Sequence, residues 1–375
     1  MKRPARTPIS LASFLVVLLA VAGSAHATAS GSRQARIAAA ADAAVAAGVP
    51  GVVVYSRLGN QTTLLARGVD NLETERPMTT ADRFRIGSVT KTFVATLIMQ
   101  LVQERKLALD DSIDKQLPGL VPNGASITIR QLLTHTSGLP DYFSNKRIYA
   151  PYLNGNLTYV WPHRTIVRLS TRDKPLFAPG TPGRWAYSNT GYYILGLTIE
   201  HVTGHTLARE LSTRIFEPLH LSSTTLPSTP ALPARYAHGY TPVGQKLHDI
   251  THISPSILWA AGGIVSTPRD VAVFQRALFQ GRLVSLPLVR QMQTTQIVIP
   301  GSRGRQSMGI GLFERRFACA AGWGHGGDLP GFTTNAYSSP NARRQMVVAV
   351  NAGEEGELTP GARDALARLV DIAYC

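Results

Sequence analysis

The chain has 375 residues, of which 44% are hydrophobic and 16% are charged, so it is long enough for one large domain or two closely packed ones. This balanced composition excludes a disordered chain, a collagen and a coiled coil. The formal net charge is +15, but the sequence has no basic cluster of five to eight residues and no aromatic residues interleaved with arginines. We therefore expect no nucleic-acid partner.

Residues 1–27 have the pattern of a secretory signal peptide. Three basic residues open the segment, an apolar run follows over residues 9–21, and the tripeptide AHA at 25–27 matches a small-residue cleavage site. The apolar run is short for a membrane span, and no cysteine directly follows it for lipid attachment. We expect cleavage before Thr28, a periplasmic or secreted protein of net charge +12, and no stable membrane anchor after cleavage. An uncleaved anchor is the alternative.

The spacing of apolar residues and turn signals predicts the remaining elements. In chain order they are a helix over 32–48, strands over 50–57 and 61–68, helices over 90–104, 128–133, 192–202 and 207–216, strands over 331–338 and 344–351, and a helix over 360–373.

The order of these elements predicts an α+β fold, because strands lie near both ends of the chain and helices lie between them. We expect one sheet domain built from residues 28–85 and 255–375. A mainly helical region, residues 86–254, is inserted between its two halves.

Two cysteines, Cys319 and Cys375, are present. An oxidising compartment favours a disulfide between them. The bridge would join the end of the last helix to the segment before a predicted strand. Two free thiols are the alternative.

A Ser-x-x-Lys pattern at residues 88–91 is the first with chemical content. Residues three apart share a helix face, so the amine of Lys91 can reach the hydroxyl of Ser88, and a serine needs such a base to become a nucleophile. The pattern recurs at Ser112 and Lys115, but only the first copy leads into a long apolar helix. The sequence therefore favours Ser88 as the nucleophile.

Two further patterns lie downstream. Tyr187-Ser188-Asn189 follows a loop rich in glycine and proline, and a loop tyrosine can relay protons if cations lower its pKa. The bare Tyr-x-Asn pattern also occurs at Tyr152-Leu153-Asn154 and is common in surface loops.

The third pattern is His325-Gly326-Gly327. Glycines on a strand let a substrate backbone approach closely, and a histidine can donate a hydrogen bond or, when protonated, supply a charge. On its own, this tripeptide is typical of a turn.

Taken in order, the three patterns resemble the motifs of the serine β-lactamase and penicillin-binding-protein-like superfamily, on the branch of class C β-lactamases and D-alanyl-D-alanine carboxypeptidases. The first two are 99 residues apart and the last two 138. Longer segments resemble the family as well: FRIGSVTKTF around Ser88, LLTHTSGLPDY at 132–142, PGTPGRWAYSNTGYYILG at 179–196, AAGGIVSTPRD at 260–270 and GHGGDLPGF at 324–332.

The resemblance implies a β-lactamase/transpeptidase-like fold, in which helices flank an antiparallel sheet and the site lies between the sheet and the helical region. It also implies that Ser88 is acylated while Lys91 and Tyr187 share the proton transfers. Asn189, His325, Gly326 and Gly327 would bind the substrate. The backbone N–H groups of Ser88 and Asp328 would form the oxyanion hole.

Two residues depart from the class C pattern. His325 stands where class C β-lactamases typically have lysine, which resembles certain carboxypeptidases, D-aminopeptidases and esterases. We expect His325 to bind a substrate carboxylate best when it is protonated. Asp328 is an unusual neighbour for an oxyanion donor, and we expect its side chain to point away, because strand side chains alternate.

Other hydrolase classes lack their signatures here. The sequence has no Gly-x-Ser-x-Gly elbow and no His-Glu-x-x-His motif, and His248, Asp249 and His252 are typical of a polar loop. We expect no metal and no cofactor.

The leading hypothesis is a D-alanyl-D-alanine carboxypeptidase-like serine hydrolase. Its substrates would be small peptides, with cell-wall peptidoglycan as a candidate partner. A class C-like β-lactamase, a D-aminopeptidase or an esterase could use the same site on a β-lactam, amide or ester. The third hypothesis is a non-catalytic binder of wall peptide or β-lactam.

Overall fold

The computed structural model describes residues 33–243, 246–353 and 358–375. The predicted signal peptide, residues 1–27, lies outside the described residues. Among the described residues, no helix is both long enough and apolar enough to cross a membrane.

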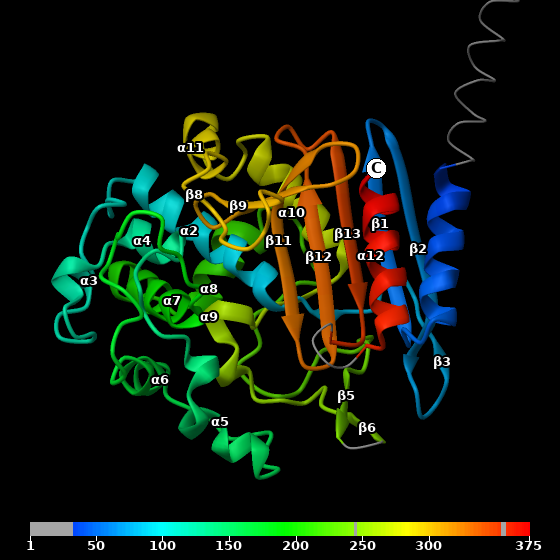
Figure 1. Cartoon of the computed structure of the whole chain (residues 1–375), viewed down its shortest axis with the longest axis horizontal. Coiled ribbons are helices and arrows are strands. Elements are labelled where there is room, and N and C mark those ends of the chain that lie inside the picture. The colour runs from blue at the N-terminus through cyan, green and yellow to red at the C-terminus, as the bar shows by residue number, and fades with distance from the viewer. Residues whose placement is uncertain (1–32, 244–245, 354–357) are drawn as a thin grey trace, which may run out of the picture.

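A nine-stranded sheet with the order β3-β2-β1-β13-β12-β11-β10-β9-β8 forms one half of the molecule (Figure 1). Every strand pair in it is antiparallel. The strands are β1 (Gly51–Leu58), β2 (Gln61–Asn71), β3 (Arg76–Pro77), β8 (Ile297–Val298), β9 (Gln306–Met308), β10 (Phe313–Arg316), β11 (Ala321–Leu329), β12 (Phe332–Ser338) and β13 (Arg344–Val350).

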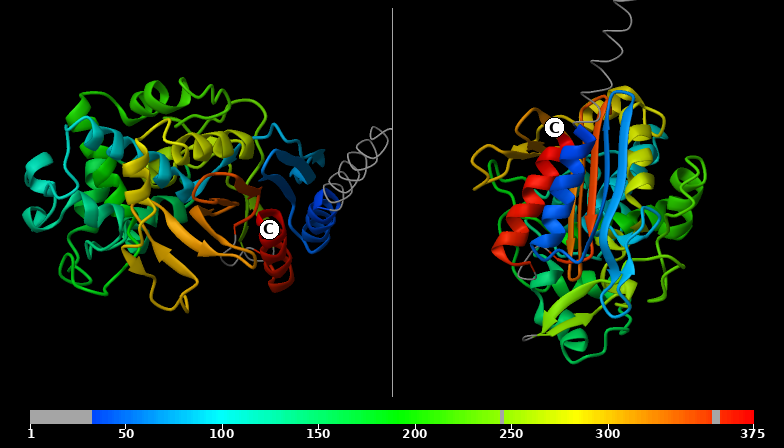
Figure 2. Two further views of the ribbon diagram at one scale, coloured as in Figure 1. Left: turned by 90° about the horizontal axis from the view of Figure 1, so that it is seen from above. Right: turned by 90° about the vertical axis from the view of Figure 1, so that its right-hand side faces the viewer.

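Both faces of this sheet are covered because its central strands are apolar on both sides. Along β1, Val52 and Val54 pack with α12 (Pro360–Tyr374) and a helix over residues 33–46, whereas Val53 and Tyr55 join the larger core on the other face. Figure 2 shows the helix over 33–46 and α12 side by side on one face. On the opposite face lies α10 (Pro268–Phe279). Strands from the first and last parts of the described chain thus form one sheet.

The second half of the molecule is mainly helical. Its helices are α2 (Thr90–Gln103), α3 (Ile113–Gln116), α4 (Ile129–Leu133), α5 (Lys146–Leu153), α6 (His163–Ser170), α7 (Asn189–Thr203), α8 (Leu207–Leu211), a π-helical turn (Ser212–Phe216) and α9 (Trp259–Gly262).

Helices α2 and α7 are apolar on nearly all sides and form the centre of the helical region. The proposed domain boundaries at residues 86 and 255 stay a prediction. Helix α9 follows residue 255 but packs against α7 of the helical region, since a Cβ on Gly196 would lie 2.7 Å from the Cβ of Ala260. Several elements were not predicted, namely β4 (Phe84–Arg85) with β7 (Val265–Ser266), the hairpin of β5 (Tyr240–Val243) and β6 (Lys246–Asp249), α10, α11 (Leu286–Met292) and β8 to β10.

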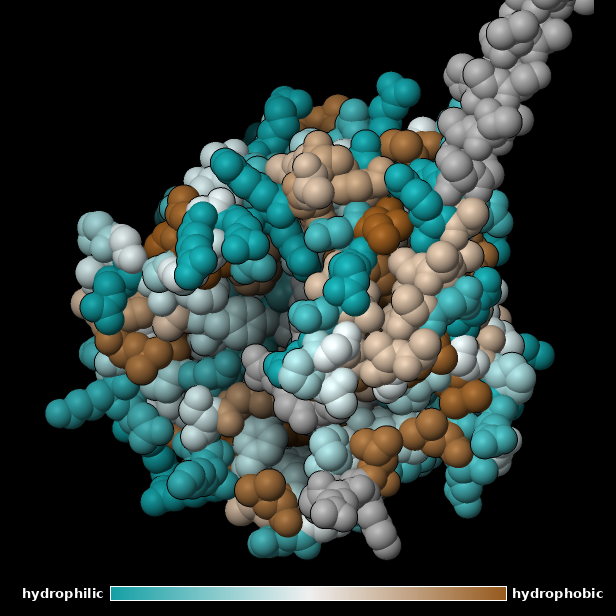
Figure 3. All heavy atoms as spheres, turned by 45° about the vertical axis from the view of Figure 1, so that its right-hand side comes forward, coloured by the Kyte–Doolittle hydropathy of each residue, from teal (hydrophilic) through white to brown (hydrophobic). Residues whose placement is uncertain are grey.

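A disulfide joins Cys319 to Cys375, with their Cα atoms 5.7 Å apart. It attaches the end of α12 to the loop between β10 and β11. In the chain-entropy account, closing a loop of this length stabilises a fold by about 3–4 kcal/mol. The surface seen in Figure 3 is mixed, with apolar residues in separate patches among hydrophilic ones.

Candidate active site

Ser88 lies in a short helical turn, η1 (Gly87–Val89), directly before α2, and this turn packs against β11. Gly87 has a φ of +54°, and a Cβ on it would lie 3.2 Å from the backbone nitrogen of Asp328. A Cβ on Gly327 would lie 3.0 Å from the backbone nitrogen of Ser88. The two N–H groups predicted to form the oxyanion hole therefore come from segments in direct contact. A glycine is needed at position 327 because a side chain there would clash with the backbone at the start of η1. The sequence pattern alone predicts for this glycine only that it makes room for the substrate.

The amine of Lys91 is completely buried and lies among three oxygen atoms. Its Nζ is 2.9 Å from Ser88 Oγ, 2.6 Å from Asn189 Oδ1 and 2.7 Å from the carbonyl oxygen of Ala261. Burial lowers the pKa of Lys91 to about 7, although the nearby carboxylate of Asp141 acts in the opposite direction. At neutral pH a large fraction of this amine is uncharged and able to accept a proton.

The phenol of Tyr187 approaches the same serine. Its hydroxyl donates to Ser88 Oγ at 2.8 Å, and its ring centroid lies 4.4 Å from that of the buried His135. Burial raises the pKa of Tyr187 well above its ordinary value, and the bond to Ser88 offsets this only in part. The condition named for a proton relay, a pKa lowered by cations, is therefore not met. Tyr187 is a neutral phenol that can donate a proton.

Asn189 is the first residue of α7, and its amide is held on both sides. Its oxygen faces Lys91, and its Nδ2 donates to Asp141 Oδ2 at 2.9 Å. The other carboxylate oxygen of Asp141 accepts the backbone N–H of Phe143 at 3.0 Å. Asp141 therefore fixes which end of the Asn189 amide faces Lys91.

The side chain of His325 is only 2% exposed. Burial, reinforced by the charge of Lys91, lowers its pKa to about 3. Its Nδ1 lies 2.5 Å from the carbonyl oxygen of Gly326, which accepts a hydrogen bond and so fixes the proton on Nδ1. Nε2 is then a hydrogen-bond acceptor, and it has no partner among the described residues.

These observations correct the expectation that His325 binds a carboxylate as a cation. At neutral pH the ring is uncharged, and its second nitrogen, Nε2, is buried and can only accept a hydrogen bond, so the ring has no donor to offer a carboxylate oxygen.

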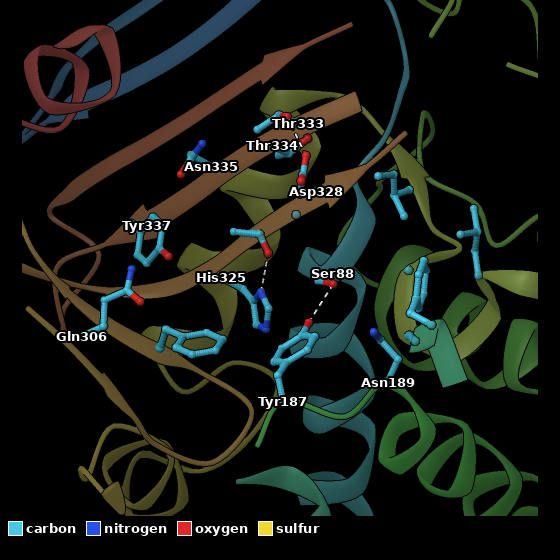
Figure 4. Close-up of a pocket in the computed structure, with 18 of the residues that line it drawn as sticks. Ser88, Tyr187, Asn189, Gln306, His325, Asp328, Thr333, Thr334, Asn335 and Tyr337 are labelled. Carbon is cyan, nitrogen blue, oxygen red and sulfur yellow. Dashed lines mark hydrogen bonds between the residues drawn. The ribbon is translucent and has the colours of Figure 1, made fainter. Parts of the chain in front are cut away.

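A cavity of about 400 Å³ opens beside Ser88 (Figure 4). Part of its wall is apolar or aromatic: Tyr142, Phe143, Leu258, Phe313 and Leu329. Among the described residues that line it, none is lysine or arginine, and Asp328 is the one with a formal charge. Asp328 is solvent-exposed, and its carboxylate accepts the Thr333 hydroxyl at 3.0 Å on the cavity wall, so the expectation that its side chain points away from the site is wrong.

The two duplicate patterns lie in other surroundings. Ser112 caps α3 by accepting the backbone N–H of Lys115, whose amine pairs with Asp111 at 2.5 Å. Tyr152 lies near the end of α5, and its hydroxyl donates to the carbonyl of Tyr159. The structure thus brings Ser88, Lys91, Tyr187, Asn189 and His325 around one cavity and leaves the duplicates outside it.

Three contributors to the site were not identified as functional from the sequence: His135, Asp141 and the carbonyl of Ala261. His135 lies against Tyr187, and its Nδ1 accepts the backbone N–H of Ser188 at 3.1 Å. All three lie within the segments LLTHTSGLPDY and AAGGIVSTPRD. Those segments were the available signal, but a sequence pattern does not show which of their side chains face the nucleophile.

The arrangement has the parts that acyl transfer requires. Ser88 has an amine of lowered pKa on one side and a phenol on the other, at distances that allow proton transfer. The two backbone N–H groups predicted to form the oxyanion hole, those of Ser88 and Asp328, lie at the η1–β11 contact.

A model of the Beta-lactamase family matches residues 36–371. The chain is 30% identical over 255 residues to Penicillin-binding protein 4* of Bacillus subtilis (strain 168), which covers 60% of this chain and 53% of that protein. It is 28% identical over 330 residues to a D-aminopeptidase of Brucella anthropi, which covers 87% of this chain and 59% of that protein. The chain therefore spans little more than half the length of these relatives.

Solved structures give a similar result. A D-stereospecific amidohydrolase from Streptomyces sp. superposes with a TM-score of 0.79 at 35% identity, covering 85% of this chain and 94% of that one. A D-amino acid amidase from Ochrobactrum anthropi SV3, in complex with L-phenylalanine amide, superposes with a TM-score of 0.80 at 31% identity, covering 91% and 97%. Since the family match covers most of the chain and these neighbours share its fold, the protein belongs to the Beta-lactamase family, within the serine β-lactamase and penicillin-binding-protein-like superfamily of hydrolases.

Proposed function

We infer that this protein hydrolyses amides of D-amino acids that carry a free α-amine, through an acyl-enzyme on Ser88. The solved neighbours named as a D-stereospecific amidohydrolase and a D-amino acid amidase support this substrate class. So does the charge of the cavity, in which Asp328 can attract an ammonium group.

The observation that carries the proposal is the tautomer of His325. A carboxypeptidase must hold the carboxylate of a leaving residue close to the scissile bond. Here the adjacent side chain is a neutral imidazole whose N–H is bonded to the carbonyl of Gly326, so it offers a carboxylate neither a charge nor a free donor. The geometry thus favours the amidase or aminopeptidase hypothesis over the carboxypeptidase that the sequence placed first.

The proposed reaction begins when neutral Lys91 accepts the proton of Ser88 as Oγ attacks the amide carbon. The carbonyl oxygen becomes an oxyanion held by the backbone N–H groups of Ser88 and Asp328. Tyr187 donates its hydroxyl proton to the leaving nitrogen as the C–N bond breaks, and it regains a proton from Lys91. A water molecule then attacks the acyl-enzyme by the reverse sequence, releasing the acid and restoring Ser88.

The test is a substrate panel measured as kcat/KM: D-alaninamide, L-alaninamide, N-acetyl-D-alaninamide, N-acetyl-D-alanyl-D-alanine and nitrocefin. We expect D-alaninamide to be preferred and N-acetylation to reduce kcat/KM by at least 10-fold, because it removes the ammonium group. Asp328→Asn should cause a similar loss with D-alaninamide, and Asp173→Asn, at an exposed loop position, serves as the control. Preference for N-acetyl-D-alanyl-D-alanine would support the carboxypeptidase instead.

We also infer that the enzyme acts outside the cytoplasm, where peptides of the cell wall contain D-residues. The support is the signal-like pattern of residues 1–27. Sequencing of the exported protein should find Thr28 at its N-terminus, and Met1 there would overturn this proposal.

A further inference from the structure

A second, larger groove of about 1040 Å³ adjoins the catalytic cavity. The two hollows share four lining residues: Gln306, Gly326, Asn335 and Tyr337. A chain leaving the cavity can therefore continue directly into the groove.

The strand register places this connection on one face of the sheet. In β11, Gly326 pairs with Asn335 of β12, and Asp328 pairs with Thr333, so all four positions face the same side. A Cβ on Gly326 would meet only the Tyr337 hydroxyl, at 3.9 Å. This glycine leaves the passage between the cavity and the groove open.

Four arginines line the groove: Arg303, Arg305, Arg315 and Arg316. Within the described ranges, none of them has a carboxylate oxygen within 4.0 Å, and Asp371 is the one acidic residue lining the groove. The groove therefore has an excess of positive charge, whereas Asp328 is the one residue with a formal charge among the described residues that line the catalytic cavity.

Arg315 is held in place for binding at the centre of this surface. Its Nη1 donates to Asn335 Oδ1 at 3.2 Å, and its guanidinium carbon lies 5.0 Å from the ring centroid of Phe317 and 5.9 Å from that of Tyr337. A guanidinium restrained in this way loses less conformational entropy when it binds an anion.

The two charged regions lie at opposite ends of the reacting centre. Along β11, Gly327 contacts the backbone nitrogen of Ser88, Asp328 follows it, and Gly326, which borders the groove, precedes it. In Figure 4, Asp328 and Thr333 lie above Ser88, whereas Gln306 and Tyr337 lie to the left of His325. A substrate with an ammonium group on its acyl side and a carboxylate on its leaving side matches this polarity.

We propose that the arginine groove binds the C-terminal carboxylate of the leaving peptide, so that the preferred substrates are short peptides with an N-terminal D-residue rather than simple amides. This inference rests on the proposed function, because it takes the acyl-enzyme on Ser88 and the ammonium subsite at Asp328 as given. A leaving group of one residue places its carboxylate beside neutral His325, whereas a longer one extends it toward the arginines.

The experiment compares D-Ala-Gly, D-Ala-Gly-Gly and D-Ala-Gly-Gly-Gly, each as the free acid and as the C-terminal amide. We expect the ratio of kcat/KM for acid over amide to be near 1 with one glycine and about 10 with two or three. The ratio for the longer peptides should fall toward 1 in Arg315→Gln, in the double variant Arg303→Gln/Arg305→Gln, and in 0.5 M salt. Arg172→Gln, at an exposed position in the helical region, should keep the wild-type ratio.

A ratio near 1 for all lengths in the wild type, or a ratio that the arginine variants leave unchanged, would overturn the groove proposal while D-alaninamide hydrolysis still supports the proposed function. If D-alaninamide is not hydrolysed, the proposed function fails. The groove is then tested by calorimetric titration of the Ser88→Ala variant with the tripeptide acid and amide. Inhibition by polyphosphate without any preference for the acid would assign the groove to a phosphate polymer and overturn the peptide proposal.

Discussion

The chain contains the Ser-x-x-Lys pattern twice, and the two copies have different surroundings. The amine of Lys91 is fully buried between Ser88, Asn189 and Ala261, whereas the side chain of Lys115 is 62% exposed and pairs with Asp111. The same three-residue spacing therefore gives a base with a pKa of about 7 in one place and an ordinary surface ion pair in the other.

The difference comes from what packs on each segment. The residues of α2 after Ser88 are buried on nearly every side by the helical region and the sheet, so the amine loses its water and gains fixed acceptors. Helix α3 has only four residues, and Ser112 serves as its N-cap. In this chain, the properties of the Ser-x-x-Lys pattern thus depend on long-range packing around it.

The largest expected effect comes from removing one lysine of the pair. Lys91→Met should lower kcat/KM by about 10³- to 10⁴-fold, because the general base is lost. Lys115→Met should change it less than twofold. Equal losses of kcat/KM in the two variants would contradict the assignment of Lys91 as the general base.

The wild-type pH profile tests the same amine. Since Lys91 acts as a base only when neutral, kcat/KM should be low in acid and rise with pH through about 7. No inflection should appear near pH 6.5 from His325, whose pKa is about 3. A profile that falls as pH rises through 6.5 would restore the cationic role first expected for His325.

A smaller effect is expected from Tyr187→Phe, which keeps the ring and removes the hydroxyl that bonds to Ser88. We expect kcat to fall by about 10²-fold with little change in KM, because proton donation to the leaving nitrogen is lost. The rise in activity with pH should persist, since it belongs to Lys91. A change in KM alone would indicate that the phenol only shapes the cavity.

Asp141→Asn should reduce kcat/KM by a still smaller factor, and the shift of its pH profile tests whether Asp141 acts on the pKa of Lys91. The Asp141 carboxylate raises the pKa of Lys91, so its neutralisation should move the midpoint of the pH profile to lower pH. The lost contact to Asn189 should reduce kcat/KM by about 10-fold, which corresponds to one hydrogen bond. Asp173→Asn is the matched control, and an unshifted midpoint would make Asp141 merely structural.

The smallest effect belongs to the second serine. Ser112→Ala should leave kcat/KM unchanged and lower the free energy of unfolding by about 1 kcal/mol, because α3 loses its N-cap. Denaturant titration measures the second quantity. A loss of activity without loss of stability would contradict the assignment of Ser112 to capping.

Much of the fold could be predicted because its signals are local. The apolar runs at β1, α2, α7, β12, β13 and α12 have the correct period and clear turn or cap residues at their ends. The start of α10 also has a local signal that was missed: Thr267 caps the helix and Pro268 stands at its first position. Strands β8 to β10 are only two to four residues long, too short for an alternating pattern to emerge.

The sequence predicted which side chains meet at the candidate site, but not their electrostatics. Helix spacing indicated that Ser88 and Lys91 would meet, and the family resemblance added Tyr187 and His325. Whether each is charged depends on burial by segments far apart in the chain, which no local pattern encodes. For this reason the pKa of Tyr187 is raised rather than lowered, and His325 is a neutral ring rather than the expected cation.

The most direct test of the central claim is covalent labelling of Ser88. A fluorophosphonate reacts with an activated serine regardless of the natural substrate, and peptide mass spectrometry locates the adduct. We predict one adduct, on the peptide that contains Ser88, which is absent in Ser88→Ala and retained in Ser112→Ala. An adduct that survives Ser88→Ala, or one found on Ser112, would contradict the assignment of Ser88 as the nucleophile.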